Sequence, residues 1–100
     1  MAQRTVELTK AAADDMNDAR QWLHQPGAGA AARQRHQVLS RAIRTLRTDP
    51  MRYRRDLEDE RLRIISVEGY RIIFTVVPDT GDNRTAGDVT VLAVLGPGEP

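Results

Sequence analysis

Three mainly apolar segments in the second half of the chain, separated by polar breaks, have the composition of β-strands. They lie at 61–67, 70–77 and 88–95, and each is rich in Val and Ile. Glu68-Gly69 separates the first two, and a polar stretch rich in Gly, Asp and Asn occupies 78–88. Such breaks are typical of turns and loops. The pattern predicts three consecutive antiparallel strands, with 78–88 as the longest loop and a mobile one.

The first half of the chain has a 3.6-residue period instead. Thr9 can cap a first helix, with Asp14 and Asp15 near its positive end, and Pro26-Gly27-Ala28-Gly29 ends it. Its apolar stripe is Ala12, Met16, Ala19 and Leu23, with Trp22 beside it as a further core residue. A second helix is expected over about Ala30 to Arg47, with Asp49-Pro50 after it. Its apolar side is Ala32, Leu39, Ala42, Ile43 and Leu46.

A short strand is expected at Gln3 to Leu8, where Val6 and Leu8 alternate with polar neighbours. The element order is therefore β-α-α-β-β-β. We predict a single α+β domain over residues 1–100, an antiparallel sheet with a helical hairpin packed on one face.

The two faces of this sheet differ in character. Tyr70, Ile72, Phe74 and Val76 form one apolar set on the central strand, which we assign to the helices. The second face mixes arginine with aliphatic residues, which is typical of a surface that a partner covers. We assign to it Arg71, Ile73, Thr75 and Val77, together with Arg61, Arg63, Ile65 and Val67 of the preceding strand.

The net charge of +1 conceals a basic block. Residues 33–55 contain eight arginines against one acid, Asp49, whereas the remainder of the chain is mildly acidic. A block of this kind suits either an acidic partner or a solvated helix face. There is no cysteine, which excludes disulfides and thiol chemistry, and no stretch is apolar enough to span a membrane. We expect a cytoplasmic protein that does not bind membranes.

Support for catalysis or metal binding is weak. His24 and His36 lie on different helices without a nucleophile or paired carboxylates, so we predict no metal site and no cofactor. Arg61, Arg63 and Arg71 could stabilise phosphate charge, but cleavage also needs a proton donor or acceptor. Besides the two histidines, Tyr53 and Tyr70 are the remaining moderate candidates, and Tyr70 is expected to point into the core.

Several segments in this order resemble the ParE/RelE superfamily of bacterial type II toxins. They are the opening VELT, the Pro-Gly turn, AIRTLRTDP at the end of the second helix, Arg63 ahead of Ile65 and Val67, the segment Gly69-Tyr70-Arg71-Ile72, and the closing VTVLAV. The resemblance implies the fold derived above. It also implies a cognate antitoxin that covers the toxin in a hetero-oligomer, growth arrest on expression, and a role in plasmid stabilisation.

Two branches of the superfamily imply different targets. RelE-like members cleave messenger RNA on the ribosome, and Arg63 and Arg71 would be the catalytic arginines here. The basic, Tyr-containing segment that those members carry after the last strand is replaced by LGPGEP. ParE-like members poison DNA gyrase without catalysis of their own, and this chain is more similar to them. We therefore expect a gyrase inhibitor without enzymatic activity, with the ribosome-dependent ribonuclease and an inactive family member as alternatives.

The resemblance and the sheet pattern together yield two candidate surfaces. The predicted antitoxin-binding residues are Arg61, Arg63, Ile65, Val67, Arg71 and Ile73. The residues expected to steer the toxin toward its target are Arg41, Arg44, Arg47, Arg54 and Arg55.

Overall fold

The fold follows the predicted order of helices and strands. A computed structural model describes residues 4–97, so Gln3 of the expected first strand lies outside the described residues. The elements are β1 (Val6–Leu8), α1 (Lys10–Leu23), α2 (Gly29–Thr45), a 3₁₀ turn η1 (Pro50–Arg52), β2 (Arg63–Val67), β3 (Tyr70–Val77) and β4 (Asp88–Leu95). The predicted α+β class is confirmed.

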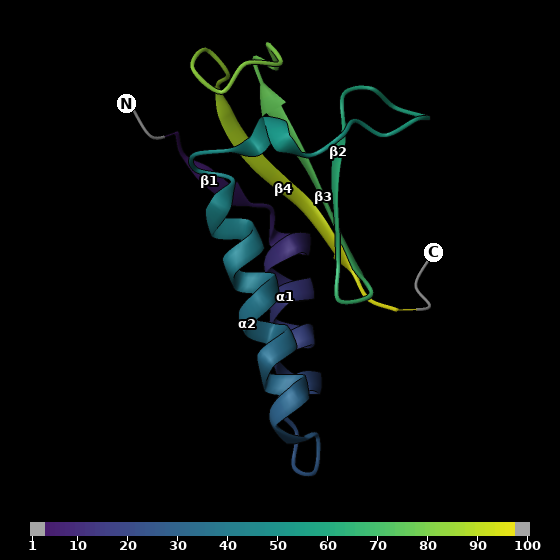
Figure 1. The fold of residues 1–100 in the computed structure, drawn as a ribbon. Helices are drawn as coiled ribbons and strands as arrows, with labels where there is room; N and C mark the ends of the chain where they lie inside the picture. Colours follow the sequence, from purple (N-terminus) through teal and green to yellow (C-terminus); the bar gives the residue numbers. More distant parts are fainter. Residues whose placement is uncertain (1–3, 98–100) are drawn as a thin grey trace.

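The sheet has the strand order β1-β4-β3-β2. As predicted, β2, β3 and β4 are antiparallel neighbours. The first strand adds a feature that the sequence did not reveal, because β1 pairs with β4 in parallel, with Val6 opposite Val89. The sheet is therefore mixed, and the two ends of the chain are joined through neighbouring strands. The helical hairpin lies on one side of the sheet and its tip projects beyond the strands (Figure 1).

The start of α1 is fixed to β4 as well as capped. The Oγ1 of Thr9 accepts from the N–H of Ala12 at 3.1 Å and donates to the carbonyl of Leu92 at 3.1 Å. Asp14 and Asp15 lie beyond the first turn of the helix, so their expected role at its positive end is wrong. Asp15 instead accepts from the N–H of Val94 at 2.9 Å, which satisfies a donor at the β4 edge beyond the end of β1.

The core lies between the helices and one face of the sheet. It includes Phe74 and Ile72 of β3, Leu39 of α2 and Leu46 directly after α2, all four fully buried. The predicted apolar face of β3 is therefore confirmed. Trp22 is a correction: it is 65% exposed, because the buried stripe of α1 runs through Ala12, Ala19 and Leu23 and leaves the indole to one side.

The loop between β3 and β4 is anchored at several points, contrary to the mobile loop expected there. Asn83 donates to Asp49 at 2.7 Å and accepts from the N–H of Met51 at 3.0 Å. Arg4 donates to the backbone carbonyls of Asn83 and Gly87. This loop is thereby tied to the N-terminal segment and to the turn that follows α2. Among residues 4–97, no helix is long and apolar enough to cross a membrane.

Candidate partner-binding surfaces

The tight turn between β2 and β3 decides which side chains share a face of the sheet. Glu68 and Gly69 both have positive φ, 54° and 80°, and they form a two-residue loop that places Val67 opposite Tyr70. Directly opposed residues point to the same face. Arg63 is thus paired with Phe74, and Ile65 with Ile72, on the face that the helices cover.

This register corrects the predicted grouping of side chains. Arg63 and Ile65 are 6% and 4% exposed and Val67 is half-buried, so none of the three belongs to the open face that carries Arg71 and Ile73. The prediction placed odd-numbered residues of both strands on one face. With two residues in the turn, odd-numbered positions of β2 share a face with even-numbered positions of β3. Glu68-Gly69, recognised in the sequence as the break, already contained that signal.

Arg63 is neutralised by an acid that was not among the predicted site residues. Its Nε and Nη2 donate to the two carboxylate oxygens of Asp79, at 2.8 and 2.9 Å, and its Nη1 donates to the carbonyl of Tyr53. Arg55 adds a third charge-assisted bond to Asp79 at 3.1 Å. The network joins β2, the segment before it and the β3–β4 loop. Arg63 is a structural residue in this arrangement.

The pKa of Asp79 reports the strength of this network. Hydrogen bonding from Arg63, with a smaller contribution from Arg55, lowers the pKa of the Asp79 carboxyl from 3.8 to about 2, although partial burial opposes the change. The carboxylate therefore stays ionised throughout the neutral range. Because Arg63 is almost fully buried and already donates to two carboxylate oxygens and a carbonyl, its guanidinium is poorly accessible to a phosphate or to a partner.

The helices do not cover the second face of the sheet (Figure 1). Arg71 and Ser66 are opposed on it and exposed, and Ile73 and Ile64 are opposed and half-buried. We call these four residues the open sheet face. Beside it, the segment before β2 borders a hollow of about 400 Å³ that Ile64, Ser66 and Arg71 also line. A cationic group above aliphatic side chains suits an acidic or amphipathic peptide.

The predicted arginines do not converge on one substrate. Arg63 and Arg71 lie on opposite faces of the sheet, and Arg61 is exposed, with two bonds of 2.9 Å to Asp59. The predicted proton-transfer candidates lie elsewhere. His24 and His36 pack edge to face between the helices with ring centroids 5.0 Å apart. Burial, followed by the charges of His24 and Arg20, lowers the pKa of His36.

Tyr53 also has a structural role, because it connects the end of α2 to β3. Its hydroxyl lies 3.2 Å from Thr45 Oγ1, and its ring packs edge to face on Phe74. Tyr70 is buried beneath the sheet, as predicted. Within the described residues, no three acid, histidine or cysteine side chains form a group that could hold a metal ion.

The basic block is divided between two environments. Arg41, Arg44 and Arg47 are all exposed on or just after α2. Arg54 is exposed too, whereas Arg55 is held by Asp79 and is only 44% exposed at its side chain. The three helical arginines therefore form the accessible part of the predicted steering set, and we call them the basic row.

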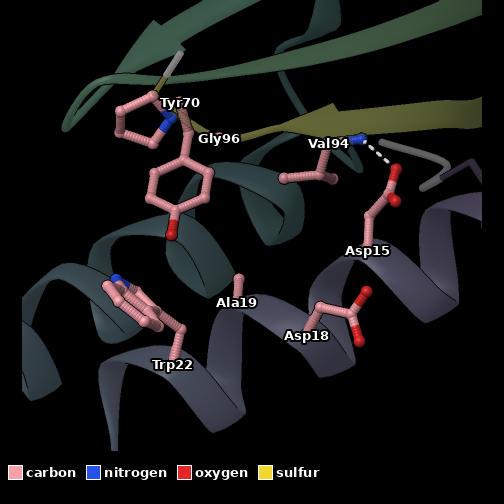
Figure 2. Close-up of a pocket in the computed structure, with 8 residues that line it drawn as sticks. Asp15, Asp18, Ala19, Trp22, Tyr70, Val94 and Gly96 are labelled. Carbon is pink, nitrogen blue, oxygen red and sulfur yellow. Dashed lines mark hydrogen bonds between the residues drawn. The ribbon is translucent and has the colours of Figure 1, made fainter. Parts of the chain in front are cut away.

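A second hollow, of about 500 Å³, lies between α1 and the end of β4. We call it the α1–β4 pocket. Figure 2 shows Asp15, Asp18 and Trp22 along the helical side and Tyr70 with Val94 on the sheet side, with the Asp15–Val94 hydrogen bond at one end. Ala19, Gly96 and Pro97 complete the lining. Sequence reasoning missed this site, because it placed Trp22 in the core and related the acids to the helix start.

Comparison with known proteins identifies the family. A family model described as the ParE toxin of the type II toxin–antitoxin system parDE matches residues 6–96. Among solved structures, the chromosomal ParDE toxin–antitoxin system from P. aeruginosa superimposes with a TM-score of 0.66 at 15% sequence identity. The alignment covers 94% of this chain and 96% of that one, which shows a shared fold. No curated protein sequence matches the chain.

Proposed function

We propose that this chain, which belongs to the ParE toxin family of type II toxin–antitoxin systems, poisons DNA gyrase in the cytoplasm and is neutralised by a cognate antitoxin. Membership of the family, over nearly the whole chain, carries the proposal. On this view the toxin has no catalysis of its own and arrests growth by interfering with gyrase. The same pairing of toxin and antitoxin would account for a role in plasmid stabilisation.

The positions of the two sheet arginines favour an inhibitor over a ribonuclease. An RNA-cleaving site needs cationic and proton-transferring groups around one phosphate. Arg63 is buried and bonded to Asp79, while Arg71 lies on the other face of the sheet. One phosphate cannot contact both guanidinium groups, which removes the support that the sequence gave to a RelE-like active site.

The open sheet face is the surface that we assign to the antitoxin. Arg71 and Ile73 keep this role from the predicted set, and their opposed neighbours Ser66 and Ile64 replace Arg63, Ile65 and Val67. Arg61 leaves the set, because it precedes β2 and is bonded to Asp59. A carboxylate of the antitoxin would pair with Arg71, and apolar side chains would cover Ile64 and Ile73.

The decisive experiment is a supercoiling assay with purified gyrase and relaxed plasmid. Added toxin should inhibit supercoiling and accumulate cleaved DNA, and one equivalent of antitoxin should restore activity. Expression in cells should arrest growth and induce the DNA-damage response. Normal supercoiling combined with cleavage of translated messages would contradict the proposal in favour of the ribonuclease. No effect in either assay would indicate an inactive family member.

A further inference from the structure

We propose that the α1–β4 pocket receives an arginine or lysine side chain of the antitoxin. The inference rests on the proposed toxin–antitoxin pairing, and it assigns to that pairing a contact separate from the open sheet face. The pocket has a volume of about 500 Å³, which is ample for one long side chain, and it opens beside an exposed tryptophan.

The first observation is unbalanced negative charge. Asp15 and Asp18 are one helical turn apart, and neither arginine nor lysine lines the pocket. Oδ2 of Asp15 accepts from the Val94 N–H, and no bond to its Oδ1 occurs within residues 4–97. Asp18 is exposed, and no hydrogen bond or ion pair to its side chain occurs within residues 4–97. Two carboxylates with open acceptor positions are suited to a guanidinium or an ammonium group.

The second observation is the aromatic wall. Trp22 is 65% exposed, an unusual state for the only tryptophan of the chain, and it lies on the same side of α1 as Asp15 and Asp18. Tyr70 lies across from it (Figure 2). An indole face attracts a cation, and the methylene stem of Arg or Lys packs on aromatic and proline rings such as Pro97. The carboxylates and the indole therefore recognise different parts of one basic side chain.

The same chemistry excludes other occupants. Phosphate or nucleic acid would be repelled by Asp15 and Asp18, and a metal ion would find only two carboxylates, one of them already engaged by Val94. A purely apolar side chain would cover Trp22 but would leave both acids desolvated without partners. A basic side chain would pair with the two acids and also cover the indole of Trp22.

The pocket also complements the rest of the toxin surface. The basic row and Arg71 favour an acidic partner, so an acidic antitoxin segment should be held there by attraction. A cation in that segment would be repelled by the basic row and attracted by the two carboxylates of the α1–β4 pocket. One basic residue would thus set the register of an otherwise acidic segment, which is a means of specificity rather than of affinity alone.

Trp22 provides a direct test, because all tryptophan emission of this chain comes from the pocket. We would titrate the full-length toxin with an antitoxin whose own tryptophans are replaced by phenylalanine. Binding should shift the emission to shorter wavelength as the indole is covered. Asp18→Asn should weaken the affinity about tenfold, and Asp18→Lys should weaken it further. Asp14→Asn is the matched control, since it removes the same charge from an exposed position of the same helix.

The outcomes distinguish failure of the pocket assignment from failure of the proposed toxin–antitoxin pairing. If wild-type toxin binds the antitoxin but Asp18→Asn and Asp18→Lys bind equally well, the pocket assignment is overturned and the pairing stands. An unchanged emission spectrum on binding would overturn it as well. If wild-type toxin does not bind the antitoxin at all, the proposed function itself fails. Replacing each Arg and Lys of the antitoxin in turn should identify one residue whose loss no longer matters in Asp18→Asn toxin, as expected for a direct pair.

Discussion

Arg63 and Asp79 form a two-point ion pair, in which Nε and Nη2 of the guanidinium donate to different carboxylate oxygens at 2.8 and 2.9 Å. Both groups are largely buried, with side-chain exposures of 8% and 16%. The pair joins β2 to the loop after β3. An arginine that was expected to bind a partner is therefore part of the folded core.

Removal of either partner should destabilise the fold. Arg63→Ala would leave the Asp79 carboxylate with fewer partners and open a cavity under β2, at a cost of about 3 kcal/mol in the free energy of unfolding. Arg61→Ala is the control, because Arg61 is exposed and its removal should leave the free energy of unfolding nearly unchanged. Urea denaturation measures both. A stable Arg63→Ala protein with weakened antitoxin binding would instead restore Arg63 to the partner surface.

The same pair should make stability depend on pH in the acid range. Because the pKa of Asp79 is about 2 in the folded protein and 3.8 in the reference state, the unfolded chain takes up the proton first. The stabilisation is complete above about pH 4 and is lost as pH falls toward 2. It amounts to something on the order of 2 kcal/mol. The unfolding free energies of wild type and Asp79→Asn should converge over this window in urea titrations, whereas parallel curves would contradict the argument.

Gly87 should not tolerate any side chain. A Cβ there would lie 1.9 Å from the carbonyl oxygen of Val77, so the two strands flanking the loop would have to separate. We expect Gly87→Ala to lower the melting temperature markedly, with a cost of at least about 2 kcal/mol. Gly81→Ala in the same loop meets nothing within 4 Å and bears only the strain of φ +77°, about 1 kcal/mol. Equal melting temperatures for the two variants would refute the close contact.

Arg71 should contribute to the affinity for the antitoxin and not to the inhibition of gyrase. If Arg71 pairs with an antitoxin carboxylate, Arg71→Ala weakens the complex by about 1–3 kcal/mol while the toxin still inhibits gyrase. Arg61→Ala removes an equal charge from an exposed position outside the open sheet face, and it serves as the control. Calorimetry gives the affinities, and the supercoiling assay gives the activity. Loss of gyrase inhibition in folded Arg71→Ala would place the target contact on this face instead.

The basic row should act mainly on the rate of association. Exposed charges attract an acidic partner over a distance but contribute little to the final contact. Neutralising Arg41, Arg44 and Arg47 together to Gln should slow antitoxin binding about tenfold at low salt and flatten its salt dependence, with the fold intact. Stopped-flow fluorescence across a salt series measures this effect.

A second triple variant controls for net charge. Lys10, Arg20 and Arg84 are exposed cations outside the basic block, and their replacement by Gln removes the same formal charge. If both triple variants slow association equally, overall charge is responsible and the basic row has no special role. A solvated helix face, the simpler interpretation of the block, predicts an unchanged rate for the first variant.

Local patterns in the sequence determined the elements of this protein. The Val- and Ile-rich segment 70–77 forms a strand, and Tyr70, Ile72 and Phe74 share its covered face because neighbouring residues of a strand point to opposite sides. The cap at Thr9 and the break at Asp49-Pro50 depend on residues within a few positions of each helix end. Signals of such short range can be interpreted without knowledge of the remaining fold.

Tertiary structure decided which of these side chains face a partner. Arg63 is buried because Asp79, sixteen residues later, is brought against it by the β3–β4 loop. The parallel pairing of Val6 with Val89 joins segments from opposite ends of the chain. Trp22 is exposed because the face of α1 that meets the sheet runs through Ala19 and Leu23 instead. Each outcome depends on how distant elements pack. Periodicity along one segment does not specify which side of that segment will face its neighbours.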